Sequence, residues 1–273
     1  MAETSTATKR YAVVTGANKG IGLEICRQLT SHGIVVVLTA RDEKRGLEAV
    51  QKMKDSGISD DLVVFHQLDV VDPDSIASLV EFVKTKFGKL DILVNNAAIS
   101  GVVLNADAFQ RAFELSGCWP DGEEVWNEIE TQSFELAEQC IKTNYYGNIP
   151  NGRVKGLLND VESLTGDRID EILKEFLKDF KEGLLKTKGW PTQLSAYTVA
   201  KAAMNAYTRI LAKRYPNFHA NCVSPGYCKT DLSTNTGYFT AAEGAEGAVR
   251  LALLPDGGPS GFCFLQKEML TYF

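Results

Sequence analysis

The stretch that decides the fold reads Tyr11-Ala-Val-Val-Thr15-Gly16-Ala-Asn18-Lys19-Gly20-Ile21-Gly22-Leu-Glu-Ile. A short run of β-branched residues leads into three glycines, and apolar residues with helical spacing follow. Glycine lets the backbone turn sharply and approach a ligand, while a helix N-terminus offers free N–H groups to anionic oxygens. The pattern predicts a strand, a phosphate-binding loop and a helix, with an ordinary strand–turn–helix corner as the alternative.

Strand-like and helical segments alternate beyond this loop. Apolar runs predict strands at 11–15, 34–39, 62–68, 91–94, 219–223 and 261–265. Helical patterns predict a helix opening at Pro73 and helices at 107–115, 123–146 and 241–254. Such alternation indicates right-handed βαβ units and a parallel sheet with helices on both faces. We therefore expect one α/β domain over residues 1–273, a doubly wound Rossmann-like sheet with residues 1–9 as a flexible tail.

Tyr197 and Lys201 lie four residues apart, so they share one face of a predicted helix. A free tyrosine loses its proton near pH 10, roughly, and a neighbouring cation lowers that pKa. The pair therefore suits the donation of a proton to a developing alkoxide. The spacing by itself is weak evidence, because such pairs occur on many solvated helix faces.

Composition limits the classes of function. A chain of 273 residues, 44% hydrophobic, can bury the core of one domain, and its net charge of −6 argues against a nucleic-acid surface. The six cysteines lack Cys-x-x-Cys or metal-ligand spacing, which predicts reduced thiols, no disulfide and no metal site. The polar N-terminal decapeptide and the lack of a membrane-length apolar run predict a soluble, cytoplasmic protein.

A third motif, Leu90-Asp-Ile-Leu-Val-Asn95-Asn96-Ala97, runs a buried strand into an amide pair. With the three motifs in this order, the chain resembles the short-chain dehydrogenase/reductase family. It is similar to the plant group that includes salutaridine reductase, neomenthol dehydrogenase and isopiperitenone reductase, which is related to animal carbonyl reductases. The resemblance implies NADPH-dependent reduction of a ketone on a hydrophobic monoterpenoid or alkaloid. It also implies that the amphipathic segment 159–188, inserted before Tyr197, covers the face through which other members pair, hence a monomer.

The resemblance assigns roles to individual residues. Tyr197 would be the general acid, Lys201 would lower its pKa and bridge the nicotinamide ribose, and Asn144 would support a water relay. The residues that it implies for binding NADP(H) are Gly16, Asn18, Lys19, Gly20, Ile21, Gly22, Arg41, Asp69, Val70, Asn95, Ala97, Tyr197, Lys201, Pro225, Gly226 and Thr230.

Arg41 indicates which cofactor is preferred. NAD enzymes of this kind usually carry an acid at the end of the second strand, where it bonds the ribose 2′-hydroxyl. Here that strand leads into Ala40-Arg41, and a guanidinium suits a 2′-phosphate through bidentate, charge-assisted bonds. Lys19 in the glycine loop adds a second cation. The pattern predicts a preference for NADPH over NADH.

One departure from the family pattern lies between Gly147 and Gly166. The family has a helix and then a buried strand ending in a serine that polarises the substrate carbonyl, whereas this chain has no strand-length apolar run there. Roughly two to three dozen residues are absent, enough for half a helix and a strand. Neither Ser163 nor Ser195, which has the position of a helix N-cap, replaces that serine.

The missing strand leaves alternatives open. The sheet is expected to close with one strand fewer, to recruit a surrogate around 153–158, or to fold poorly, and activity is expected to be weak. The alternative function is therefore an NADP(H)-binding deletion variant with little or no catalysis. A sugar-nucleotide epimerase also uses Tyr-x-x-x-Lys, but the glycine spacing and the lack of a C-terminal substrate domain count against it.

Overall fold

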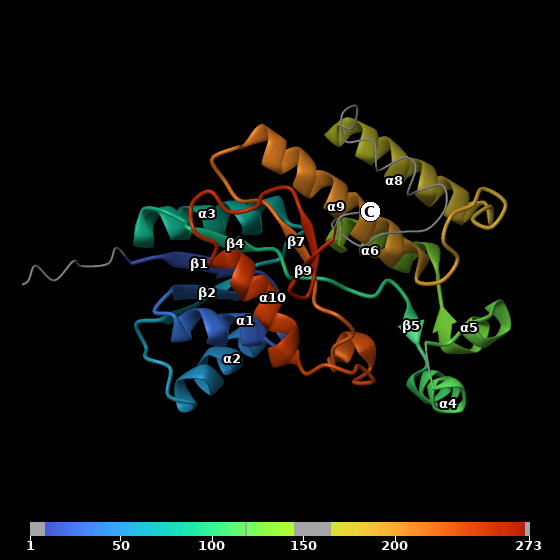
Figure 1. Cartoon of the computed structure of the whole chain (residues 1–273), viewed down its shortest axis with the longest axis horizontal. Helices are drawn as coiled ribbons and strands as arrows, with labels where there is room; N and C mark the ends of the chain where they lie inside the picture. Colours follow the sequence, from blue (N-terminus) through green and yellow to red (C-terminus); the bar gives the residue numbers. More distant parts are fainter. Residues whose placement is uncertain (1–8, 118, 145–164, 271–273) are drawn as a thin grey trace, which may run out of the picture. The chain divides into compact units, whose positions relative to one another are not determined.

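The computed structural model describes residues 9–117, 119–144 and 165–270 (Figure 1). The chain divides into two compact units, the first made of residues 1–97 with 239–253 and the second of residues 98–238 with 254–273. The expectation of one domain over the whole chain stays a prediction.

The first unit contains a parallel sheet of four strands in the order β3-β2-β1-β4. The strands are β1 (Tyr11–Val14), β2 (Val35–Ala40), β3 (Val63–Gln67) and β4 (Ile92–Val94). Val13 of β1 is in register with Val37 of β2 and with Leu93 of β4, so the strand that leads into the glycine loop is central. Each of the four strands predicted in this unit is found within one residue of its expected bounds.

Helices cover both faces of this sheet (Figure 1). The side chains of β1 and β2 alternate, because successive residues of a strand point to opposite faces. Ala12, Val14, Val36 and Leu38 pack with α1 (Gly20–Ser31), α2 (Glu43–Asp55) and α10 (Ala241–Ala252). Val13 and Val37 face α3 (Pro73–Phe87) instead. The predicted Rossmann-like α/β class, with a parallel sheet and helices on both faces, is confirmed.

Local capping explains where these helices begin. Asp42 accepts a hydrogen bond from the N–H of Arg45 at 2.9 Å, and Asp72 accepts one from Asp74 at 3.0 Å beside Pro73. Thr240 and Glu243 form a reciprocal capping box at the start of α10. Helices α2, α3 and α10 therefore begin at residues whose side chains satisfy otherwise orphaned backbone donors, whereas α1 has no side-chain cap.

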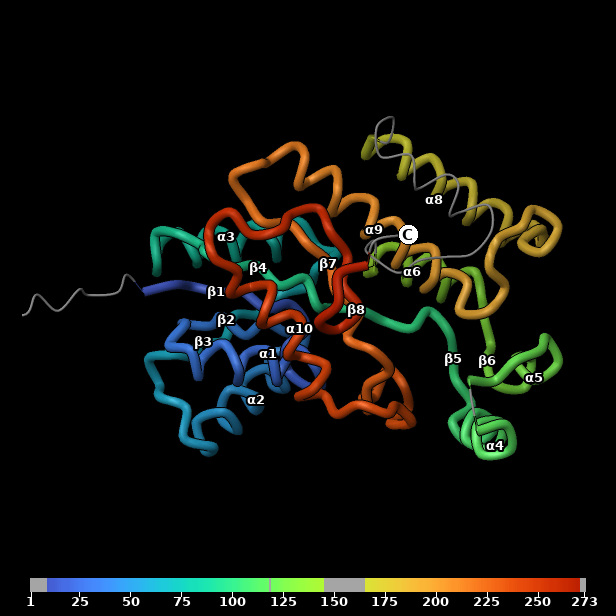
Figure 2. Tube along the Cα trace, in the orientation of Figure 1, coloured from blue at the N-terminus to red at the C-terminus, as the bar shows by residue number. Residues whose placement is uncertain are grey.

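The second unit is built on three packed helices, α6 (Phe134–Asn144), α8 (Gly166–Lys181) and α9 (Ser195–Arg214). Figure 2 shows α8 beside α9. Their shared core includes the buried side chains of Ile169, Ile172 and Phe176, which is the apolar stripe expected in segment 159–188. Residues 159–164 of that segment lie outside the described residues.

The helix predicted at 123–146 is wrong as a single element. The structure has α5 (Glu123–Ile129), the short strand β6 (Glu130–Thr131) and then α6, and residues 145 and 146 lie outside the described ranges. β6 pairs antiparallel with β5 (Val103–Leu104), next to α4 (Ala106–Ser116). Ser133 restarts the helix, because its hydroxyl and carbonyl accept from Leu136 and Ala137. Glu130 and Thr131 therefore form a strand in spite of the local helical pattern, because they pair with β5, which lies roughly thirty residues earlier in the chain.

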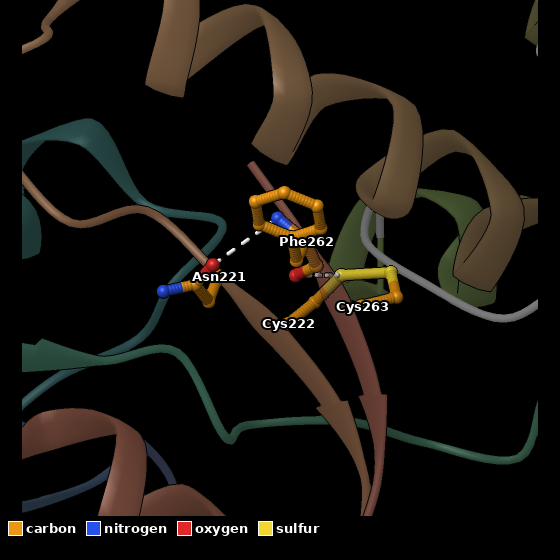
Figure 3. Close-up of a disulfide and its surroundings, with 4 residues drawn as sticks. All are labelled: Asn221, Cys222, Phe262 and Cys263. Atoms are coloured by element: carbon orange, nitrogen blue, oxygen red, sulfur yellow. Dashed lines mark hydrogen bonds between the residues drawn. A yellow bond between two sulfur atoms is a disulfide. The ribbon is translucent and has the colours of Figure 1, made fainter. Parts of the chain in front are cut away.

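A second sheet in this unit has the order β7-β8-β9, from β7 (Cys222–Ser224), β8 (Cys263–Leu265) and β9 (Glu268–Met269). Cys222 and Cys263 are direct partners in the parallel β7–β8 register and form a disulfide (Figure 3). Asn221 supports the same strand pair, since its side chain accepts from the N–H of Phe262 at 3.1 Å. The expectation that the chain has no disulfide is wrong for this pair, because register between strands 41 residues apart is not visible in cysteine spacing.

Within the described part of the chain, the parallel strands thus fall into two sheets, β3-β2-β1-β4 and the β7–β8 pair, to which β9 adds an antiparallel strand. Among the described residues, β4 pairs only with β1, and β7 pairs only with β8. The expected closure into one sheet with one strand fewer is therefore not found among the described residues. The surrogate expected around 153–158 lies outside the described residues. Across 9–117, 119–144 and 165–270, no helix combines the length and apolar character needed to cross a membrane.

Candidate active site

The glycine loop after β1 is packed so closely that side chains are excluded. Gly16 and Gly20 have φ values of 61° and 57°, in the left-handed region that favours glycine. A Cβ on Gly16 would lie 2.8 Å from the Cα of Ala97, and one on Gly22 would lie 2.4 Å from Nδ2 of Asn96. The loop therefore keeps a bare backbone surface, as close approach to a pyrophosphate requires.

Thr15 and Asn96 fasten this loop to the end of β4. The Thr15 hydroxyl accepts from the N–H groups of Asn96 and Ala97, at 2.9 and 3.0 Å. Nδ2 of Asn96 donates to the carbonyls of Thr15 and Gly16, at 2.9 and 3.1 Å. The sequence motif drew attention to Asn95 and Ala97, whereas the structure shows that Asn96 and Thr15 shape the loop.

The N-terminus of α1 has the properties of an anion site. Lys19 occupies the N-cap position without a capping side-chain hydrogen bond, and the first turn contains no acid. The N–H groups of Gly20, Ile21 and Gly22 belong to this first turn, where backbone donors have no intrahelical acceptor. The adjoining Asn18 is half-buried. The donors and the helix dipole fit the pyrophosphate of a dinucleotide.

The other expected cofactor residues of this unit follow the carboxyl ends of its strands. Arg41 directly follows β2, its side chain is exposed, and its carbonyl accepts from Gln67 at 3.0 Å. Asp69 lies in the turn after β3, where its carboxylate accepts from the N–H of Val71 at 3.1 Å, with Val70 between. Asn95 directly follows β4 and is exposed. Parallel strands end at one edge, so the structure brings these residues to the edge that carries the glycine loop.

In the second unit, Tyr197 and Lys201 share one face of α9. Nζ of Lys201 lies 5.8 Å from the centre of the Tyr197 ring, and both side chains are half-buried. Burial raises the pKa of Tyr197 to about 12, and the nearby Cys140 thiol adds to the rise. Burial lowers the pKa of Lys201 to about 8. At neutral pH the pair is thus a neutral tyrosine beside a lysine cation, and the lysine loses its charge near pH 8.

The expected net lowering of the Tyr197 pKa beside Lys201 is wrong for the chain by itself, because burial raises that pKa. Burial removes water from both Tyr197 and Lys201 and so penalises the charged form of each group. This raises the pKa of the tyrosine and lowers the pKa of the lysine. Tyr197 is consequently protonated at neutral pH.

Asn144 ends α6 with a buried side chain that is fully engaged. Its Oδ1 accepts from the N–H of Ile99 at 2.7 Å, and its Nδ2 donates to the Ile99 carbonyl and to Sγ of Cys140, the latter at 3.3 Å. The side chain therefore fixes the strand-end segment at Ile99. With this side chain engaged, a water relay at Asn144 would use its backbone carbonyl.

The loop after β7 contains Pro225, Gly226 and Thr230. Gly226 has a φ of 80°, and Thr230 forms a capping box with Ser233 at a short 3-10 helix, η1 (Asp231–Ser233). The N–H of Tyr238 donates to the carbonyl of Tyr227 at 2.8 Å, which closes the loop on itself. The segment expected to meet a carboxamide is therefore preorganised by its own hydrogen bonds.

Ser195, at the start of α9, does not take the place of the missing carbonyl-polarising serine, because its hydroxyl is already bonded. Ser195 is buried, its hydroxyl donates to Oε1 of Gln132, and its N–H donates to the same oxygen at 3.3 Å. Ser163 lies outside the described residues. Within the described ranges, no group of three or more His, Cys, Asp or Glu side chains could hold a metal ion.

Sequence reasoning missed three side chains near these elements: Cys140, Glu130 and Gln132. Glu130 and Gln132 bind the start of α9, although they lie about sixty residues earlier in the sequence, and no local pattern reveals such contacts. Asn96, by contrast, carried a visible signal as the second member of the amide pair at a strand end.

Comparisons with known proteins agree with this geometry. Residues 10–116 match the family model described as short chain dehydrogenase, and residues 184–250 match the one described as enoyl-(acyl carrier protein) reductase. The chain is 49% identical to a (+)-neomenthol dehydrogenase of Arabidopsis thaliana, over 97% of this chain and 99% of that protein. The solved structure of salutaridine reductase from Papaver somniferum superposes with a TM-score of 0.84 at 45% identity, covering 94% of this chain and 99% of that one.

A short-chain dehydrogenase/reductase 1 from Saponaria officinalis is 48% identical, and the alignment covers 100% of both chains. That alignment has 305 positions against 273 residues in this chain, so at least 32 positions of the relative have no counterpart here. The deficit has the size expected from the missing helix and strand. The chain belongs to the short-chain dehydrogenase/reductase family.

Proposed function

We propose that the protein is an NADPH-dependent reductase that converts a ketone on a hydrophobic small molecule, of monoterpenoid or alkaloid type, into an alcohol. The observation that carries this proposal is the half-buried Tyr197–Lys201 pair on α9. The names of its relatives, neomenthol dehydrogenase and salutaridine reductase, support the substrate class.

The chain's residues suit both phosphate groups of NADPH. The uncapped N-terminus of α1 would hold the pyrophosphate, and Arg41 at the end of β2 would pair with the 2′-phosphate. Asp69 and the N–H of Val70 would hold the adenine edge, and Asn95 and Ala97 would flank its ribose. When bound, the nicotinamide supplies a hydride.

Tyr197 would complete the reduction by giving its phenolic proton to the carbonyl oxygen as the hydride reaches the carbonyl carbon. The products are an alcohol and a tyrosine phenolate, which the Lys201 ammonium stabilises. Lys201 would then pass its proton to the phenolate, and a water held by the backbone carbonyl of Asn144 would return a proton from solvent. The hydroxyl lost with the missing serine strand has no replacement in this sequence of steps.

An aromatic cluster supports a hydrophobic substrate. Tyr227, which follows Gly226, stands edge-on to Trp119 with 5.0 Å between ring centres, and Trp119 stands edge-on to Phe109 at 5.4 Å. Trp119 is 43% exposed, so part of its ring faces solvent. Large rings beside the loop after β7 would favour an apolar ligand over a charged one.

The second candidate function is binding of NADP(H) with little or no catalysis. It is favoured by the buried, hydrogen-bonded Ser195, by the edge position of β4 among the described strands, and by the 32-position deficit. The first two observations concern the parts that would polarise the carbonyl and hold the sheet together.

The two candidates are separated by incubating the purified chain with NADPH and a panel of cyclic ketones while following NADPH absorbance. Reduction is expected, with a loss on the order of a hundredfold or more in Tyr197→Phe, because the proton donor is removed while cofactor binding remains. Tyr207→Phe, the same change farther along α9, serves as the matched control. NADPH binding without turnover of any ketone would establish the second candidate instead.

We also propose that the protein is a monomer. α8 packs its apolar stripe against α6 and α9, so these helices have an intramolecular partner for that face. Sedimentation equilibrium tests this, and a dimer at micromolar concentration would contradict it.

A further inference from the structure

The start of helix α9 is held by two side chains from another part of the second unit. Glu130, in β6, accepts from the N–H of Leu194 with both carboxylate oxygens, at 3.2 and 3.1 Å. Gln132 accepts from the N–H and the hydroxyl of Ser195. The Gln132 amide in turn donates to Glu130 at 2.7 Å and to the carbonyl of Thr192 at 2.8 Å. Glu130 and Gln132 thus form one bonded clamp on residues 192–195.

The helix needs this clamp because it cannot cap itself. Leu194 stands at the N-cap with no side-chain hydrogen bond, and the first turn of α9 contains no acid. Leu194 also has φ 44° and ψ 40°, a left-handed conformation that is costly for a branched side chain. Glu130 supplies both the missing acceptor and a negative charge at the positive end of the helix dipole.

Tyr197 lies in the turn that the clamp fixes. The first intrahelical bond of α9 runs from the N–H of Thr198 to the carbonyl of Leu194 at 2.8 Å, so Leu194, Tyr197 and Thr198 belong to one turn. Leu194 packs beside the buried rings of Phe109 and Trp126, which sets the direction in which the helix begins. Lys201 lies one turn farther along, where intrahelical bonds already hold the backbone.

We propose that Glu130 and Gln132 are positioning residues that set the place of the Tyr197 hydroxyl relative to the substrate carbonyl. This rests on the proposed reductase function. Loss of the clamp frees the first turn of α9, moves the phenol more than the Lys201 ammonium, and lowers the rate of proton transfer. Binding of NADPH, which the proposal assigns to the glycine loop and Arg41, is left intact.

The first test measures the clamp without any assay of activity. Hydrogen exchange followed by mass spectrometry on the full chain should show faster exchange of the amides of 194–198 in Gln132→Ala than in wild type. Gln139→Ala, which removes an exposed glutamine of α6, is the matched control and should exchange as wild type does. Unchanged exchange at 194–198 in Gln132→Ala would overturn the clamp.

The second test measures its catalytic consequence. Gln132→Ala and Glu130→Ala should each lower kcat for the best ketone of the panel roughly tenfold or more, with the Kd of NADPH changed less than about twofold. Glu130→Gln keeps one acceptor oxygen for the N–H of Leu194 and should restore most of kcat. Glu128→Gln, the same change at an exposed site of α5, should have no effect.

A role in stability alone would lower the melting temperature and leave kcat of the folded enzyme unchanged at a temperature well below melting. That outcome would overturn the assignment of Glu130 and Gln132 as positioning residues, as would equal losses in Glu130→Ala and Glu130→Gln. If the wild-type chain reduced no ketone, the proposed function would fail, and hydrogen exchange would still decide whether the clamp exists.

Discussion

The ammonium of Lys201 lies 5.8 Å from the centre of the Tyr197 ring, and burial moves the pKa values of the two groups in opposite directions. Tyr197 keeps its proton up to a pKa of about 12, whereas Lys201 has a pKa of about 8. The neutral phenol and the charged amine coexist at neutral pH, which is the combination that a proton donor for ketone reduction needs. This relationship gives the first two predictions.

Reduction should lose rate as pH rises through about 8, because Lys201 then loses the charge that stabilises the developing phenolate. Tyr197 should add no alkaline decline in the same range, since its pKa is about 12. The measurement is kcat/KM between pH 6 and 10, roughly. In Lys201→Arg the guanidinium stays charged, so the decline near pH 8 should disappear even if the overall rate is lower. An unchanged decline in Lys201→Arg would assign it to another group.

The buried charge of Lys201 should also lower the free energy of unfolding at neutral pH. Its folded pKa of about 8 lies below the ordinary 10.5, so between these values the unfolded chain holds a proton that the folded chain lacks, and stability rises with pH. Lys201→Met should remove the buried cation, abolish that rise and stabilise the chain at pH 7 by about 1–2 kcal/mol.

Urea unfolding between pH 7 and 9.5, roughly, measures this effect below the range in which Tyr197 would act in the opposite sense. Lys174→Met, at an exposed position of α8, is the control and should leave the pH dependence as it is. A Lys201→Met variant that is less stable than wild type at pH 7 would contradict the burial cost.

Arg41 should decide the preference for NADPH. Arg41→Ala removes a charge-assisted partner of the 2′-phosphate and should weaken NADPH binding roughly ten- to a hundredfold, with the Kd of NADH nearly unchanged. Fluorescence titration with each cofactor measures both constants. Lys52→Ala, farther along α2, is the control. Equal losses for both cofactors would show that Arg41 supports the fold and not the phosphate.

The missing strand should limit both activity and stability. Loss of one oxyanion donor typically costs roughly two to three decades in rate, and β4 pairs with only β1 among the described strands. Inserting a family-like strand with its serine between Gly147 and Gly166 should therefore raise kcat and the melting temperature together. The check is side-by-side kinetics and thermal unfolding of the two chains. Full reductase rates in the original chain would mean that another hydroxyl polarises the carbonyl.

The sequence alone determined the local features of this protein. The β-branched run and glycines after Tyr11 fix a strand, a tight loop and a helix, because steric limits on φ and ψ act within a few residues. The spacing of Tyr197 and Lys201 fixes their common helix face for the same reason. The identity of the family could also be read from these local patterns, whereas the shortage of a strand stays a prediction.

Only the tertiary structure decided what depends on distant partners. The sign of the Tyr197 pKa shift follows from burial, which the i, i+4 spacing does not contain. The Cys222–Cys263 bond follows from strand register, and the clamp of Glu130 and Gln132 on α9 follows from the pairing of β6 with β5. Each effect joins residues separated by about forty to sixty positions, where chain connectivity no longer fixes their distance and packing does.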